Sequence, residues 1–290
     1  MPTDPPLRRK WNITRWLVVL ALLGLGWSGW RVYAFRSALK QAEALGWTVE
    51  HTDPVETIRA NWKTAFRKET WLDGVTFVDI PTSEAFEQHP AIVRRLNPRG
   101  LRIDNAATLR DLSALSPLTR LQGIYLYDCT GLTNMDAIKN LPALRRVDLI
   151  GCTGLTNVDA LKSLSALQNL FLTGCTGLTN VDALKNLSAL QGLGLIRCTG
   201  LTNVDALKNL SALQDVILTG CTGLTNVDWL KNLSGLQEVW LDGCTGLTNV
   251  DALKNLSALQ KVWLNGCTGL TKESVVALKA ALPNAQISAP

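Results

Sequence analysis

The most reactive side chains in this chain are seven cysteines, which occur every 23 residues from Cys129 to Cys267. Thiols bind zinc or form disulfides, so the spacing has to be compared with the needs of both. A structural zinc site uses clustered ligands such as C-x-x-C, and the sequence contains no such cluster. The two histidines, His51 and His89, both precede the first cysteine. We therefore predict no metal site and no cofactor.

A ladder of disulfides is the second possibility, if each cysteine occupies the same place in a stack of repeats. Neighbouring strands of a sheet lie about 4.8 Å apart, whereas the Cβ atoms of a disulfide are roughly 3.5–4.5 Å apart. Seven cysteines would also leave one unpaired. The favoured interpretation is a buried column of free thiols whose S–H groups help to satisfy backbone carbonyls.

Catalytic constellations are missing from the repeats. They contain no histidine to act as a base, no nucleophile elbow and no phosphate loop. The segment "GLGWSG" at 24–29 matches a dinucleotide motif but lies inside an apolar run. In the recurring "VDALK", Asp182 is interpreted as a turn-capping residue and Lys185 as a solvated one. We predict that the protein is not an enzyme.

The positive charge is confined to the beginning of the chain. The first 40 residues hold seven Lys/Arg and one Asp, which leaves 22 Lys/Arg against 23 Asp/Glu for residues 41–290. A net charge of −1 over residues 41–290 leaves the repeat region with no electrostatic footprint for nucleic acid.

The elements that must position these residues follow from the 23-residue period. In one copy Leu170 and Leu172 have the spacing of two that a strand with one buried face requires. From Val181 onward the apolar spacing is three, which suits a 3₁₀-like return better than an α-helix. Each copy is therefore predicted to form a short strand, a corner, a return and a second corner. One copy cannot offset its own ordering entropy, so the copies must stack.

The pattern L-x-x-L-x-L-x-x-C-x-x-L-x-x-V-x-x-L-x-x-L resembles the leucine-rich repeat family, most closely its short bacterial and SDS22-like members. Two departures are Cys where that class usually has Asn, and the extra residue in "CTGL". The resemblance implies an α/β right-handed solenoid with a concave parallel β-sheet. It does not imply a particular function, since members of the family mostly bind other molecules, and these are of very different kinds.

The repeats are assigned to residues 98–272, and they include a degenerate copy at 101–122 with Ala106 in the cysteine position. Residues 273–290 break the pattern and are predicted to form a C-terminal cap with a helix and a last strand. Residues 36–97, which contain Trp47, Trp62 and Trp71, are predicted to form a mainly helical N-terminal cap.

The N-terminus predicts membrane attachment. After a basic tail at 1–15, residues 16–35 reach the ~20 residues of a transmembrane helix, with Arg31 snorkelling and aromatic residues near both ends. A cleaved signal peptide is the alternative. We predict a signal-anchor with the N-terminus in the cytoplasm and the repeats outside it, in a single-pass protein of a bacterial envelope.

The candidate binding residues lie where the copies differ. Variation concentrates in three columns around each strand, and strand alternation points all three away from the core onto the concave face. Exposed aromatic residues are unusual on a solvated face and indicate binding of a protein or peptide partner. A carbohydrate ligand and a structural scaffold without a specific ligand are the alternatives. The candidate residues are Tyr125, Tyr127, Arg146, Asp148, Phe171, Ile217, Glu238, Trp240, Asp242, Lys261, Trp263 and Asn265.

Overall fold

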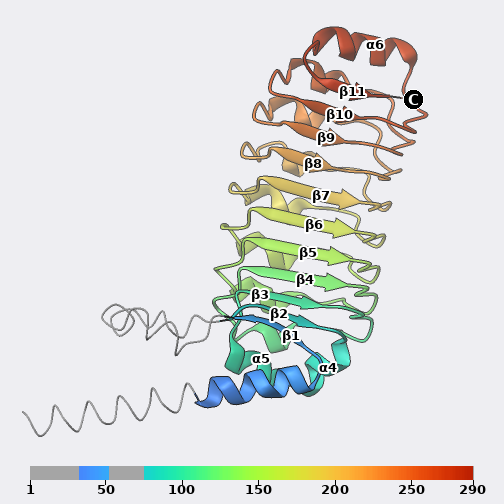
Figure 1. The fold of residues 1–290 in the computed structure, drawn as a ribbon. Coiled ribbons are helices and arrows are strands. Elements are labelled where there is room, and N and C mark those ends of the chain that lie inside the picture. The colour runs from blue at the N-terminus through green and yellow to red at the C-terminus, as the bar shows by residue number, and fades with distance from the viewer. Residues whose placement is uncertain (1–32, 52–74, 290) are drawn as a thin grey trace, which may run out of the picture.

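One long sheet organises the molecule. The computed structural model describes residues 33–51 and 75–289. In these residues eleven strands lie side by side in chain order (Figure 1). β1 is antiparallel to β2, and each later pair is parallel. The strands are β1 (Thr48–His51), β2 (Val75–Ile80), β3 (Gly100–Ile103), β4 (Gly123–Tyr127), β5 (Arg146–Ile150), β6 (Asn169–Thr173), β7 (Gly192–Ile196), β8 (Asp215–Ile217), β9 (Glu238–Trp240), β10 (Lys261–Trp263) and β11 (Gln286–Ser288). The predicted repeat solenoid with a parallel sheet is confirmed.

The return of each repeat is a 3₁₀ helix, as the spacing of three predicts. These helices stack behind the sheet, so that each repeat closes one turn of the solenoid (Figure 1). They are η2 (Ser113–Leu115), η3 (Asp136–Asn140), η4 (Asp159–Ser163), η5 (Asp182–Asn186), η6 (Asp205–Leu207), η7 (Asp228–Asn232) and η8 (Asp251–Asn255).

The residue that caps each return differs from the predicted one. Asp182 begins η5, but the side chain that holds the turn belongs to Asn180, whose Oδ1 accepts the Asp182 backbone N–H at 3.2 Å. The same bond recurs in five other repeats, from Asn134 to Asn249. The asparagine side chain thus mimics a backbone turn two residues ahead of itself. The interpretation of Asp182 as the capping residue is wrong.

The core is a continuous column of leucines, valines and cysteines between the sheet and the returns. All seven cysteines are free and buried, as the sequence predicts. Cys221 Sγ donates to the carbonyl of Leu195 at 2.8 Å, and equivalent bonds reach back from Cys198, Cys244 and Cys267. Burial raises the pKa of Cys221 and of Cys244 to about 12. These thiols are therefore neutral structural groups at physiological pH.

A left-handed residue precedes each cysteine. In five repeats it is a glycine, with φ between 69° and 75°. Asp128 and Arg197 occupy the same position in the other two, with φ of 56° and 53°. Side chains carry a steric cost in this conformation that glycine lacks. Both positions are therefore points of local strain in an otherwise regular array.

The N-terminal end of the core is closed by helices. A helix at 33–44 lies across the end of the stack next to α4 (Ser83–Gln88) and α5 (Pro90–Leu96) (Figure 1). Its apolar side chains Phe35, Ala38 and Ala42 belong to the same core as the repeats. The sheet also continues past the predicted first repeat, because β1 and β2 fall within residues 36–97. Trp47 is buried there, while Trp62 and Trp71 lie outside the described residues.

The predicted membrane localisation is contradicted. Residues 16–32 of the predicted span, like the basic tail at 1–15, lie outside the described part of the chain. Within 33–51 and 75–289, no helix is both long and apolar enough to cross a bilayer. The last residues of the predicted span, 33–35, belong to the helix just described, and Phe35 packs into the protein core. The single-pass, extracytoplasmic assignment is corrected on this finding.

The C-terminal end of the core is covered by α6 (Lys272–Ala281) and β11 (Figure 1). Thr271 Oγ1 caps α6 by accepting the Ser274 backbone N–H at 3.2 Å. Leu278 and Leu282 are buried against the last repeat. The helix therefore shields the leucine column where the repeats stop.

Candidate binding surface on the sheet

The candidate residues share one face of the sheet, which we call the sheet face. It consists of the side chains that alternate along the strands with the core residues. Strand register aligns these side chains in three columns, so that Tyr125, Asp148, Phe171, Gly194, Ile217, Trp240 and Trp263 occupy successive rungs of the middle column. Most are half-buried by their neighbours, whereas Asn265 is exposed and Asp148 is buried. All twelve candidate residues lie in these columns.

The tryptophan cluster consists of Glu238, Trp240, Lys261 and Trp263. The two indole rings contact each other with centroids 4.1 Å apart and planes tilted by 36°. Trp240 Nε1 donates to Glu238 Oε2 at 3.3 Å, and Lys261 Nζ donates to Glu238 Oε1 at 2.8 Å. The same ammonium lies 5.7 Å from the Trp263 ring centroid. The bond from Lys261 is the main cause of a lowered pKa of Glu238.

A polar row lies beside the tryptophan cluster in the third column. Asn265 donates both its backbone N–H and its side-chain N–H to Asp242 Oδ1, at 2.8 and 2.9 Å. Ser288 Oγ donates to Asn265 Oδ1 at 2.7 Å. The three side chains hold one another in place across β9 to β11.

The arginine cluster consists of Tyr125, Arg146, Asp148 and Phe171. The Arg146 guanidinium lies between the two rings, with Cζ 5.7 Å from the Tyr125 centroid and 5.0 Å from the Phe171 centroid. It donates to both carboxylate oxygens of Asp148, at 2.9 to 3.1 Å. Burial raises the pKa of Asp148, and Arg146 opposes that rise. Ile150 and Thr173 lie beside this cluster in the third column.

Glycines on β7 separate the two clusters. Phe171 leans over this strand, so that a Cβ on Gly194 would lie 2.4 Å from Phe171 Cδ1. A Cβ on Gly192 would lie 2.6 Å from Asn169 Oδ1. The glycines therefore allow the side chains of β6 to cover β7, and the next side chains that rise from the sheet in these two columns are Asp215 and Ile217 on β8.

Sequence reasoning missed the N-terminal part of this face. Phe77 on β2 occupies the space above Gly100 and contacts Tyr125, with ring centroids 5.7 Å apart. Arg102 lies 4.8 Å from the Tyr127 ring centroid and donates to both oxygens of Asp104, at 2.9 and 3.0 Å. The sequence could have identified Arg102 as a residue of this face, because Arg102 precedes Tyr125 by one repeat period of 23 residues.

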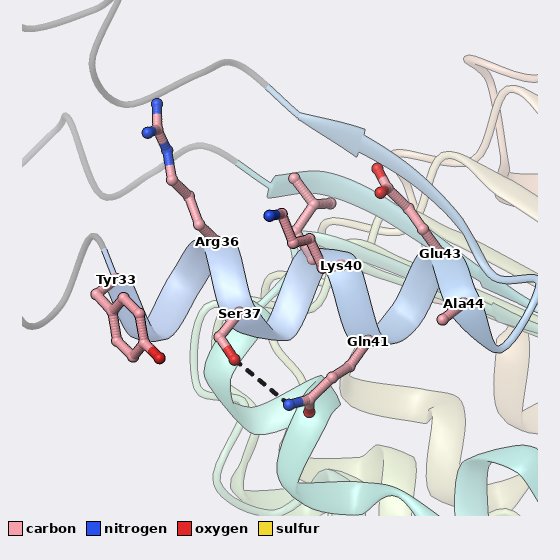
Figure 2. A pocket seen from close by; sticks show the side chains of 8 residues that line it. Tyr33, Arg36, Ser37, Lys40, Gln41, Glu43 and Ala44 are labelled. Carbon is pink, nitrogen blue, oxygen red and sulfur yellow. Dashed lines mark hydrogen bonds between the residues drawn. The ribbon is translucent and has the colours of Figure 1, made fainter.

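The described residues offer no obvious metal or catalytic site. They contain no group of three or more His, Cys, Asp and Glu residues placed to hold a metal ion. An open pocket runs along the N-terminal helix, where Gln41 Nε2 donates to Ser37 Oγ at 3.3 Å (Figure 2). The side chains that line it, among them Tyr33 and Lys40, come from this single helix. It shows no pairing of a nucleophile with a base.

Comparisons with known proteins agree with this architecture. A family model described as a BspA-type leucine-rich repeat region matches residues 104–193 and 195–276, in six copies. Among solved structures, the leucine-rich repeat domain of the type III effector XopL is 23% identical. That match covers 91% of this chain and 93% of that chain, with a TM-score of 0.63. Internalin C2 from Listeria monocytogenes is also 23% identical, with 69% and 84% coverage and a TM-score of 0.53. At this identity the structural likeness shows a shared fold alone. No curated protein matches the chain in sequence.

Proposed function

The chain belongs to the leucine-rich repeat family, with a BspA-type repeat region, and from this premise we propose that it binds a protein or peptide partner through the sheet face. Families of this kind are generally non-enzymatic modules that mediate protein interaction. A stack of repeats presents an extended surface on which each strand offers a few variable side chains. The partner would lie across several strands of this surface.

One observation carries the proposal. The copies are nearly identical in their core, corners and returns, yet the middle column holds Tyr125, Phe171, Trp240 and Trp263 among its seven rungs from β4 to β10. Packing does not require these aromatic residues, because Asp148 and Gly194 occupy equivalent positions. Large aromatic side chains at variable surface positions are typical of binding surfaces.

The test removes the tryptophan pair. The full chain and its Trp240→Ala/Trp263→Ala variant would each be used to capture partners from source cells, and the captured partner would then be purified and its affinity measured. We expect the double variant to lose affinity by about tenfold or more, as for aromatic residues at the centre of an interface. Its circular dichroism and melting temperature should show that the fold is retained.

A matched control is available on the return of a neighbouring repeat. Trp229→Ala also removes an indole, and the equivalent positions in other repeats are Ala183, Ala206 and Ala252. It should keep the partner's affinity. Equal affinity for the parent chain and the double variant would instead support the alternative of a scaffold whose sheet face has no specific ligand.

A carbohydrate is the second candidate ligand, favoured by the polar row of Asp242, Asn265 and Ser288 beside an aromatic pair. Sugar rings stack on tryptophan while their hydroxyls bond to such groups. Titration with soluble oligosaccharides, followed by tryptophan emission, separates the two candidates. A saturable change in the parent chain that is lost in Trp240→Ala/Trp263→Ala would favour the sugar.

A further inference from the structure

The sheet face carries more negative than positive charge. From β2 to β11 its columns, with Asp104 at the end of β3, contain six carboxylates and three cations. Each cation is already paired on the face: Arg102 with Asp104 and Asp79, Arg146 with Asp148, and Lys261 with Glu238. The unmatched carboxylates are therefore concentrated towards the C-terminal half, where Asp215 and Asp242 flank the tryptophan cluster.

Asp215 is the carboxylate without a partner. It is exposed on β8 in register with Glu238 on β9, which is in register with Lys261 on β10. Lys261 is bonded to Glu238, and the side-chain carboxylate of Asp215 has no hydrogen bond or ion pair with any residue that the structure describes. Partial burial of its carboxyl group and the negative charge of Glu238 raise the pKa of Asp215, while Lys261 opposes the rise. A second cation beside Asp215 would relieve this repulsion.

The surroundings of Asp215 suit a cation that carries a hydrocarbon stem. Ile217 stands two residues along β8, in register with Trp240 on one side and with Gly194 on the other. Lysine and arginine bury their methylene stems along apolar surface while the charged head stays in water. Ile217 and Trp240 supply such a surface, and the glycines of β7 add no side chain of their own next to Asp215. Lys261 shows the same arrangement inside the chain, with its ammonium on Glu238 and near the Trp263 ring.

We propose that the C-terminal half of the sheet face docks a basic segment of the partner protein. In this arrangement a lysine or arginine of the partner pairs with Asp215, and its stem lies along Ile217 and Trp240. The proposal rests on the proposed function and specifies the chemistry of the partner. Charge complementarity supports this proposal, because the cation of the C-terminal half, Lys261, is already paired with Glu238 and the remaining charge of this half is negative.

Defined peptides test the proposal with the full chain. The probe is an acetylated and amidated octapeptide of alternating lysine and glycine, compared by calorimetry with peptides that carry glutamate or norleucine in place of lysine. We expect the lysine peptide to bind, the other two not to bind, and its affinity to fall as salt is raised. Binding of the norleucine peptide as tightly as the lysine peptide would overturn the proposal.

Two variants and one control test whether a lysine of the peptide pairs with Asp215. Asp215→Asn should weaken the lysine peptide about two- to fivefold, the range for an exposed ion pair. Asp182→Asn, which removes an exposed carboxylate from a return, should leave the affinity unchanged. Lys261→Met frees Glu238 and should tighten binding. Equal affinities for Asp215→Asn and the parent chain would overturn the proposal, as would equal weakening by Asp182→Asn.

The basic-segment proposal and the proposed function can fail independently of each other. A natural partner that depends on Trp240 and Trp263, in a chain that ignores the lysine peptide, would refute the basic-segment proposal and leave the binding module in place. A partner whose affinity is indifferent to both tryptophans would refute the proposed function itself.

Discussion

Raising the pH above 9 is expected to unfold the repeat array through its buried thiols. Six of the cysteines, from Cys152 to Cys267, have pKa values raised above the ordinary 9.0. Burial is the main cause for Cys221, Cys244 and Cys267, whose pKa values rise to about 12, 12 and 11. Hydrogen bonds between neighbouring thiols are the main cause for Cys152, Cys175 and Cys198.

Whether the stability rises or falls with pH depends on whether the folded or the unfolded chain binds more protons. Between pH 9 and 11 the folded chain keeps these thiols protonated, whereas the unfolded chain releases their protons. The stabilisation is therefore complete below pH 9 and is lost as the pH rises towards the folded pKa values. At pH 10 each thiol favours unfolding by about 1.4 kcal/mol, so that six contribute roughly 8 kcal/mol. That is comparable with the whole stability of a typical domain, about 5–15 kcal/mol.

The measurement is the free energy of unfolding by urea at pH 8, 9, 9.5 and 10, followed by circular dichroism. The control is the triple variant Cys221→Ala/Cys244→Ala/Cys267→Ala, which removes half of the shifted thiols. Its stability at pH 8 should be lower because three small cavities form. Its further loss between pH 8 and pH 10 should be about 4 kcal/mol smaller than that of the parent chain.

Parallel pH dependences in the two proteins would refute this reasoning. They would mean that the thiols keep an ordinary pKa in the folded chain, for instance because water reaches the cysteine column. Reaction of the native thiols with a thiol reagent at pH 8 would lead to the same conclusion, since a buried thiol should react only after unfolding.

Two pairs of substitutions in the turns test the local structure by urea denaturation. Arg197→Gly should stabilise the chain by about 0.5–1 kcal/mol, because the steric cost of the left-handed conformation that glycine removes exceeds the entropy that it adds to the unfolded state. A loss of stability in Arg197→Gly would contradict this argument. Gly174→Ala should destabilise the chain by about 1 kcal/mol. Asn180→Ala should cost about 1 kcal/mol, because the Asp182 backbone N–H loses its partner. Asn186→Ala, in the same return but without such a bond, should be close to neutral, and equal effects of the two asparagine changes would show that the turn bond contributes nothing.

Much of the repeat region could be predicted because its period is visible in the sequence. The spacing of Leu170 and Leu172 predicted a strand, and the spacing of three after Val181 predicted the 3₁₀ return. The register between neighbouring strands could also be predicted, since residues 23 apart in the sequence become neighbours on adjacent strands, as Trp240 and Trp263 do. The same rule places Arg102 beside Tyr125, although the degenerate repeat that contains Arg102 made its position on the sheet face hard to recognise.

The N-terminal region could not be predicted in the same way. Strand β2 and its Phe77 carry no periodic copy, so their place in the sheet depends on contacts with β3 and β4 that the sequence does not display. The apolar run at 16–35 led to the contradicted localisation. Of this run the structure describes residues 33–35, and there Phe35 packs into the protein core, a contact that hydropathy does not display.

The sequence by itself determined the repeat, its stacking and which side chains leave the core. In a solenoid each unit contacts its neighbours alone, so an offset along the chain becomes a fixed offset in space. Only the tertiary structure decided how side chains on the sheet face lie against each other: Phe171 leans over Gly194, Arg146 lies between two rings, and Lys261 bonds to Glu238, which leaves Asp215 without a partner. These choices depend on side-chain shape and on competition among neighbouring charges, and the period of the sequence encodes neither.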